Sequence, residues 1–86
     1  MRSITTRCFR DRYSELPETV RAQARKAYRL FRSNPAHPGL HFKKVDDELN
    51  IYSVRVGLSH RALGELAGSQ MTWFWIGSHK AYDRKV

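Results

Sequence analysis

The sequence predicts an α+β fold in which two N-terminal helices pack on a curved antiparallel sheet of about four strands, within a single domain spanning residues 1–86. Helical periodicity is confined to the first part of the chain, and runs of strand length fill the rest. Turn signals separate these runs by a few residues, which favours neighbouring antiparallel strands over crossover connections. A chain of 86 residues has room for one core.

Two helices are predicted before residue 34. Phe9, Tyr13 and Leu16 recur at helical spacing and predict a first helix of about ten residues. Pro17 suits the first position of a second helix, because the N–H that proline lacks would have no partner there. The apolar stripe of this helix consists of Val20, Ala24, Ala27 and Phe31. A second stripe, of Arg21, Arg25, Arg29 and Arg32, either contacts phosphates or forms a solvated helix face.

Four strands are predicted after the helix-stopping segment "SNPAHPGL". Their sequences are "LHFKKV", "NIYSVRVG", "HRALGEL" and "MTWFWIG". Residues 73–76 are apolar at every position, as expected of an interior strand. The residues expected in the core are Phe9, Val20, Phe31, Val54 and Phe74.

The charge is concentrated in the first half of the chain. The net charge is +8 and the isoelectric point is about 10.3, which favours an anionic partner. Residues 1–44 hold eleven Lys and Arg against three acidic residues, whereas residues 45–86 hold five of each sign. Cys8 is the only cysteine, so no intramolecular disulfide is possible. Without a signal-like segment or a long apolar run, we expect a cytoplasmic protein with no membrane association.

Arg55 and Arg61 are the first candidates for chemistry. They lie on successive predicted strands joined by a tight turn, so they can meet across the sheet. Two guanidiniums projecting from one face make a good clamp for phosphate or carboxylate, because each presents a rigid fork of donors. The alternative is two solvated arginines paired with Glu65.

Further candidates lie at the end of the apolar strand and beside the predicted sheet. His79 follows Gly77 and Ser78, where an imidazole can exchange protons near neutral pH, and Tyr82 could present its hydroxyl to the same space. The alternative makes Tyr82 a core-capping aromatic and His79 a turn residue. Lys43 and Lys44 could bind a nucleic-acid backbone, although alternation lets only one of them share the face of Arg55.

The sequence predicts no metal site and no cofactor. His37 and His41 are four residues apart, but they flank Pro38-Gly39 in a loop and have no Cys or acidic companion nearby. Glycine-rich phosphate loops, Cys-x-x-Cys pairs and nucleophile elbows are absent from the sequence, which removes most nucleotide-dependent and acyl-transfer chemistries.

The order of these motifs resembles the RelE/ParE superfamily of bacterial type II toxins, over nearly the whole chain. The most specific elements are the Tyr-x-x-Arg strand of residues 52–55, Arg61 at the start of the next strand, and the His-x-x-Tyr-Asp-Arg close of residues 79–84. The superfamily contains ribosome-dependent mRNA endonucleases and ParE-like inhibitors of DNA gyrase. Arg84 ends the last motif, and we expect it to bind RNA together with the two lysines.

In the endonuclease branch, the resemblance implies cleavage of mRNA in the ribosomal decoding site by attack of a 2'-hydroxyl on the neighbouring phosphate, without a metal. It implies that Arg55 and Arg61 stabilise the phosphorane, and that His79 and Tyr82 occupy the C-terminal catalytic positions. Ser53 stands where some relatives have a second lysine, and no carboxylate obviously replaces the base of YoeB-like members.

Two alternatives stay open beside the endonuclease. One is a ParE-like, non-enzymatic inhibitor of gyrase, and the other is a catalytically inactive member of the fold that binds nucleic acid. The short first helix favours the endonuclease branch, because ParE-like members usually present a longer helical hairpin. The implied partners are a cognate antitoxin protein, the ribosome and mRNA.

Overall fold

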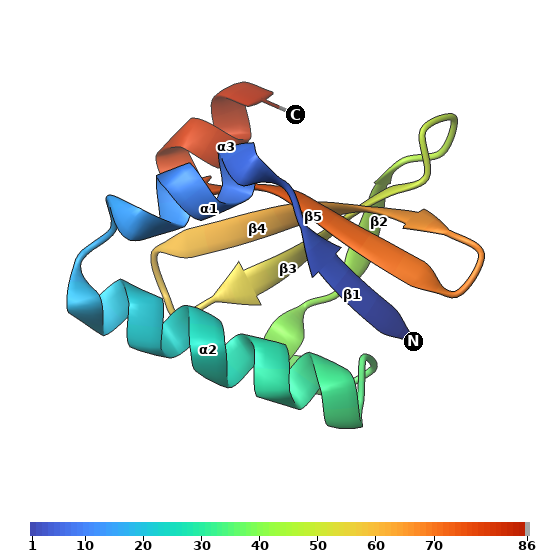
Figure 1. Cartoon of the computed structure of the whole chain (residues 1–86), viewed down its shortest axis with the longest axis horizontal. Coiled ribbons are helices and arrows are strands. Elements are labelled where there is room, and N and C mark those ends of the chain that lie inside the picture. Colours follow the sequence, from blue (N-terminus) through green and yellow to red (C-terminus); the bar gives the residue numbers. More distant parts are fainter. Residues whose placement is uncertain (86) are drawn as a thin grey trace.

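A computed structural model of the chain describes residues 1–85, which form an α+β fold with one five-stranded sheet (Figure 1). In chain order the elements are β1 (Arg2–Thr5), α1 (Arg7–Ser14), α2 (Glu18–Ser33), the 3₁₀ turn η1 (Pro38–Leu40), β2 (Lys43–Asp46), β3 (Ile51–Val56), β4 (His60–Ala67), β5 (Gln70–Ser78) and α3 (His79–Lys85). Strands β2 to β5 form the antiparallel meander that the short turns predict, so the predicted class is confirmed.

The sheet has one strand more than predicted. Its order is β1-β5-β4-β3-β2, and β1 pairs with β5 in parallel, so the sheet is mixed. The sequence of β1 is short and weakly patterned, and its strand state depends on an edge of β5 formed by residues far along the chain. Helix α2 begins at Glu18, with Pro17 as its N-cap residue rather than its first residue.

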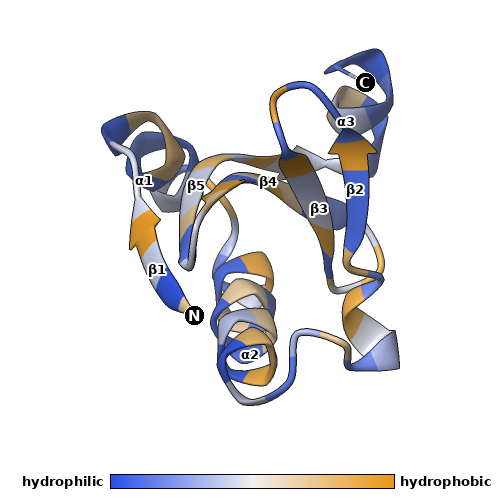
Figure 2. Ribbon diagram, turned by 90° about the vertical axis from the view of Figure 1, so that its right-hand side faces the viewer, coloured by the Kyte–Doolittle hydropathy of each residue, from blue (hydrophilic) through white to orange (hydrophobic). Residues whose placement is uncertain are grey.

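Helices cover both faces of the sheet, and each face has its own apolar core. Figure 2 shows α2 against one face, here called the α2 face, and α3 against the other, the α3 face. The buried core on the α2 face contains Val20, Ala27, Phe31, Leu40, Val54, Val56, Ala62, Met71, Trp73 and Ile76. The smaller core on the α3 face contains Leu63, Trp75 and Tyr82. No helix within residues 1–85 is long and apolar enough to cross a membrane.

Three of the five predicted core residues, Val20, Phe31 and Val54, are buried. Phe9 and Phe74 are only half-buried, and they pack against the α2-face core and the α3-face core respectively. Helix α1 packs against β5, and Phe9 lines the groove beside α2, where its side chain keeps contact with solvent.

A β-bulge in β5 lets its three consecutive aromatic residues serve both faces. Trp75 lies opposite Leu63 of β4. Trp73 lies opposite the next residue, Gly64, so Phe74 is the extra residue of the bulge. Trp73 consequently packs on the α2 face and Trp75 on the α3 face, whereas a regular strand would point both to one side. The bulge explains how a wholly apolar run forms the centre of this small sheet.

The bulge predicts that Gly64→Ala destabilises the protein. A β-carbon at Gly64 would lie 2.6 Å from Met71 Sδ and 2.7 Å from Trp73 Cε3, and both side chains are buried. Overpacking of this kind should lower the free energy of unfolding by about 1 to 3 kcal/mol, measured by urea denaturation. Gly68→Asn is the control, because Gly68 has φ +60° with open space around it and asparagine tolerates that conformation. An unchanged midpoint for Gly64→Ala would contradict the expectation.

Candidate active site on the α3 face

The two arginines singled out from the sequence lie directly opposite each other. Arg55 of β3 and Arg61 of β4 are register partners, so their side chains leave the sheet on the same face. Like charges in this arrangement repel and destabilise a sheet. Within residues 1–85 neither guanidinium forms an ion pair with a carboxylate. The pair is therefore suited to an anion that comes from outside the chain.

Arg61 is a buried cation with neutral partners. It is 6% exposed, and its Nη2 donates to Ser53 Oγ at 2.9 Å and to the carbonyl oxygen of His41 at 3.2 Å. Its guanidinium carbon lies 5.1 Å from the centroid of the Tyr82 ring. Its Nε is buried and has no hydrogen-bond partner among the described residues. This environment excludes the alternative of a solvated arginine at position 61.

Arg55 lies at the more open side of the pair. Its Nε donates to the carbonyl oxygen of Gly57 at 3.0 Å, and its Nη1 lies 3.2 Å from His41 Nε2. Gly57 has φ +60°, and a β-carbon there would meet the side-chain amide of Gln23, so the turn that holds Arg55 requires glycine. His41 thus contacts Arg55 through its ring and Arg61 through its carbonyl group.

Ser53 and Tyr82 form the floor beneath Arg61. Ser53 is fully buried, and Tyr82 Oη lies 3.5 Å from its Oγ, at the long limit of a hydrogen bond. Tyr82 is itself buried in the α3-face core. It is therefore a core-capping aromatic, which was one of the two interpretations of this residue from the sequence. Its ring also stacks against a cation, and its hydroxyl points at the serine that holds that cation.

His79 begins α3, immediately after β5, and its ring centroid lies 5.9 Å from that of Tyr82. Its Nδ1 is 3.3 Å from Asp83 Oδ2 one helical turn away, and its side chain is 55% exposed. His60 lies opposite Ser78 at the same end of the sheet, and burial lowers its pKa. Its register partner Val56 belongs to the α2-face core, so the His60 side chain leaves the sheet on the face opposite Arg61.

The two candidate lysines separate to opposite faces, as alternation predicts. Lys43 pairs with Ser53, so it shares the face of the arginines. Lys44 pairs with Tyr52 and places its Nζ 5.7 Å from that ring, on the α2 side. Arg84 is exposed in the last turn of α3. Of these three cations, Lys43 is the one that extends the arginine pair along the sheet.

Sequence reasoning missed two residues of the site. Ser53 was considered only as a departure from a lysine, and His41 only as a metal ligand with His37. His41 adopts a left-handed conformation with φ 46°, and this carries its carbonyl group to Arg61. No short-range pattern marks that conformation at a histidine. Residues 1–85 contain no group of three His, Cys, Asp or Glu side chains that could hold a metal.

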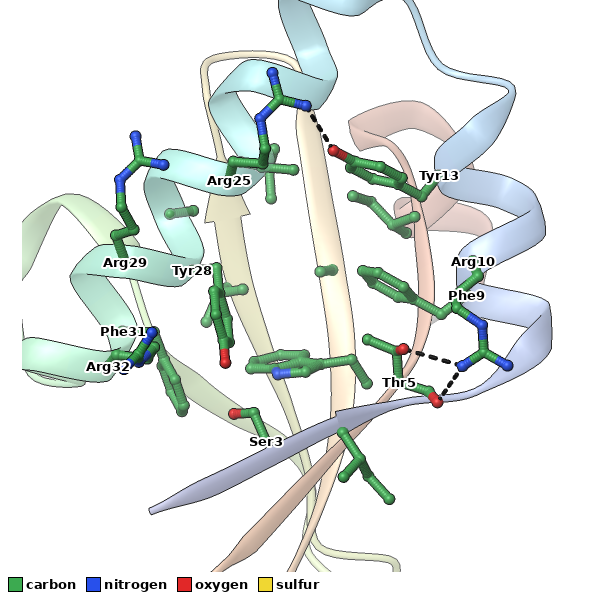
Figure 3. A pocket seen from close by; sticks show the side chains of 18 residues that line it. Ser3, Thr5, Phe9, Arg10, Tyr13, Arg25, Tyr28, Arg29, Phe31 and Arg32 are labelled. Carbon is green, nitrogen blue, oxygen red and sulfur yellow. Dashed lines mark hydrogen bonds between the residues drawn. The ribbon is translucent and has the colours of Figure 1, made fainter.

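A separate groove lies on the α2 face, between α2 and the segment formed by β1 and α1. Its volume is about 640 Å³, and it is lined mainly by apolar side chains of the α2-face core. Figure 3 shows three arginines of α2 along one side and Arg10 of α1 on the other. Ser3 Oγ and Trp73 Nε1 line this groove region and are buried without hydrogen-bond partners. The arginines of α2 are Arg25, Arg29 and Arg32.

The arginines along the groove are not equally free. Arg25 binds Glu18 and the hydroxyl of Tyr13, and its hydrogen bond to Glu18 is the main reason why the pKa of that carboxyl is lowered. Arg10 donates to Thr5. Arg29 and Arg32 have no carboxylate partner among residues 1–85. The groove therefore combines an apolar floor with unneutralised positive charge.

The fold and the site together define the class of this protein as a small, basic α+β domain with a pair of facing arginines. The chain matches the ParE-like toxin domain over residues 18–84, a span that includes every residue of the candidate site. This protein therefore belongs to the ParE-like toxin family. A search of curated proteins gave no match.

Solved structures share the fold at low sequence identity. The RelB-RelE antitoxin-toxin complex from Methanococcus jannaschii is similar with a TM-score of 0.74 and 19% identity, over 94% of this chain and 96% of the other. The YoeB/ParE toxin from Agrobacterium tumefaciens is similar with a TM-score of 0.72 and 15% identity, over 92% of this chain and 99% of the other. The isolated E. coli RelE toxin is similar with a TM-score of 0.69 and 15% identity, over 99% of this chain and 98% of the other.

Ser53→Ala should destabilise the fold through Arg61. The substitution removes the buried acceptor at 2.9 Å and leaves a guanidinium that already has one unpartnered nitrogen. A buried donor left unsatisfied costs about 1 to 3 kcal/mol, so the urea midpoint should fall. The double variant Ser53→Ala/Arg61→Met is the control, because it removes the cation as well and should recover part of the loss. Equal midpoints for Ser53→Ala and wild type would contradict this account of Arg61.

Proposed function

We propose that this protein is the toxin of a type II toxin–antitoxin system and that it cleaves mRNA on the ribosome, in the cytoplasm. The observation that supports this most directly is the pair Arg55 and Arg61, two register partners that form no ion pair with a carboxylate among residues 1–85. Cleavage of RNA creates extra negative charge on a phosphate as a 2'-hydroxyl attacks it. Preorganised donors aimed at that charge are the usual largest contribution to catalysis.

Each residue of the site has a role in this proposal. Arg55 and Arg61 bind the scissile phosphate and stabilise the pentacovalent phosphorane. His79 gives a proton to the departing 5'-oxygen, and Tyr82 orients Arg61 through its ring. Lys43 and Arg84 bind neighbouring phosphates. The mechanism uses the RNA's own 2'-hydroxyl as nucleophile, so it calls for no cofactor.

Binding to DNA gyrase without chemistry is the second candidate function. The match to a ParE-like toxin domain favours it, because the ParE-like branch that this chain resembles includes gyrase inhibitors. The burial of Arg61 also suits a residue that supports the sheet rather than one that reaches a substrate. Gyrase supercoiling and ribosome-dependent mRNA cleavage, assayed side by side, separate the two candidates.

Arg61→Ala should lower single-turnover cleavage of ribosome-bound mRNA by about 10²- to 10³-fold, by analogy with the loss of one oxyanion donor. His79→Ala should lower the same rate by a factor of about 10² to 10⁴.

Lys43→Ala should weaken the binding of RNA and flatten its salt dependence, with little change in the cleavage rate at saturation. Lys44→Ala is the matched control, since this neighbour lies on the other face. If Arg61→Ala and His79→Ala cleave as fast as wild type while growth inhibition persists, the gyrase function replaces this proposal.

We infer that the antitoxin partner anchors in the groove of the α2 face through an amphipathic helix with acidic flanks. Charge complementarity supports this occupant, because Arg29 and Arg32 are unneutralised beside an apolar floor. The Ser3 hydroxyl and the Trp73 Nε1–H, which have no partner among residues 1–85, would donate hydrogen bonds to a polar side chain of that helix. The anchor lies on the face opposite the arginine pair, so a second antitoxin segment is needed to cover the site itself.

The double variant Arg29→Glu/Arg32→Glu should bind the antitoxin encoded by the neighbouring gene at least about tenfold more weakly, because like charges would then face each other across the groove. Isothermal titration calorimetry measures the affinity. Lys26→Glu is the control, as an exposed residue of the same helix that does not line the groove. The double variant should remain toxic in cells, because its substitutions lie on the face opposite the arginine pair. Unchanged affinity of the double variant would place the antitoxin elsewhere.

A further inference from the structure

We propose that His41 is the general base of the site and removes the proton of the attacking 2'-hydroxyl at its Nε2. This inference rests on the proposed ribonuclease function and assigns the one role for which the sequence offers no carboxylate. The role belongs to a residue of the loop between η1 and β2, outside the strands that carry the arginines. Four observations support it.

The first observation is the state of the His41 ring. Arg55 Nη1 lies 3.2 Å from His41 Nε2, and a guanidinium can only donate hydrogen bonds. A hydrogen bond between these two atoms therefore requires Nε2 as the acceptor, which is the tautomer that carries its proton on Nδ1. This is the form in which an imidazole acts as a base. A phosphate that engages Arg55 would take over the Nη1 donor and release the lone pair of Nε2 for a hydroxyl.

The second observation is that one residue joins both arginines. The carbonyl oxygen of His41 accepts from Arg61 Nη2 at 3.2 Å, while its ring contacts Arg55. A phosphate held between the two guanidiniums would therefore lie beside the imidazole. The 2'-hydroxyl that attacks this phosphate belongs to the adjoining ribose, which places it within reach of the same ring.

The third observation is the rigid support of an exposed ring. Leu40, the residue before His41, is 1% exposed and is anchored in the α2-face core. Phe42, the residue after His41, is held by two aromatic rings. Its ring stacks on Tyr52 with the centroids 4.7 Å apart and meets Phe31 edge-on with the centroids 5.2 Å apart. His41 itself is exposed and has φ 46°, in the left-handed region. Such strain is retained where the surrounding structure holds it, and here it aims the imidazole at the arginine pair.

The fourth observation comes from the other three histidines. His37 Nδ1 accepts from the backbone N–H of Gly39 and serves as the cap of η1. His60 shares a 2.8 Å contact with Ser59. His79 pairs with Asp83 within α3. Among residues 1–85, His41 is the histidine whose ring contacts an arginine of the site.

The proposed step balances in protons and bonds. His41 Nε2 takes the proton of the 2'-hydroxyl, and the 2'-oxygen forms a bond to phosphorus. The bond between phosphorus and the 5'-oxygen breaks, and the electron pair leaves with that oxygen, which receives a proton from His79. The products are a 2',3'-cyclic phosphate and a free 5'-hydroxyl. Transfer of a proton from His41 and return of one to His79 through water restore both rings.

The test uses two substitutions at position 41 that the left-handed backbone accepts. His41→Asn and His41→Gly should both fold, because asparagine and glycine tolerate positive φ. We expect single-turnover cleavage of ribosome-bound mRNA to fall by about 10²- to 10⁴-fold in each. The dependence of the rate on pH should change as well, because the general base would be missing. Added imidazole should restore part of the activity of His41→Gly, since the missing ring leaves room for it.

His37→Asn is the matched control, because it makes the same change at the other end of η1 and asparagine can still cap η1. It should cleave as fast as wild type. Rates and pH profiles of His41→Asn and His41→Gly equal to wild type, with Arg61→Ala impaired, would overturn the inference and leave the ribonuclease function standing. A slow His41→Gly that imidazole does not rescue, with the wild-type pH profile kept, would also overturn it. A wild-type protein that cleaves no RNA would end the ribonuclease proposal and this inference with it.

Discussion

The pairing of β4 with β5 at the bulge is the constraint on which the rest of the structure depends. Gly64 has no side chain, and the indole of Trp73 occupies the space that a β-carbon would need. The extra residue, Phe74, then reverses the facing of every later residue in β5. Ile76 consequently returns to the α2 face while Trp75 supports α3 from the other side. Without the bulge, Trp75 would face the same side as Trp73, and the α3-face core would lose that indole.

The bulge also sets where the candidate site lies. Gly77 leaves room for the Trp75 ring, and β5 ends one residue later, so α3 starts at a defined point above β4. Tyr82 then packs over Arg61 and closes the α3-face core. A buried guanidinium held by a hydroxyl, a carbonyl group and an aromatic ring is costly to desolvate, and its own charge is not neutralised. In the function we propose, this unneutralised charge is what binds the phosphate.

The two faces of the sheet divide the work in the function we propose. The α3 face carries the arginine pair with His41. The α2 face carries the groove with its arginines (Figure 3). Residues of β3 and β4 alternate between the two, so Val54 and Ala62 line the groove while Arg55 and Arg61 face the site. An antitoxin anchored on one face would occlude the other only by passing around an edge of the sheet, which suits a partner that wraps.

Periodicity along the chain was enough to predict the class of the fold, both N-terminal helices and the meander of β2 to β5, because those patterns depend on near neighbours. Spacing across a tight turn was enough to predict that Arg55 and Arg61 face each other. Only the tertiary structure decided the strand state of β1, which needs the distant edge of β5, and the burial of Arg61 under Tyr82. It also decided the place of His41, because a left-handed residue is aimed by the buried anchors on either side of it and not by its own sequence.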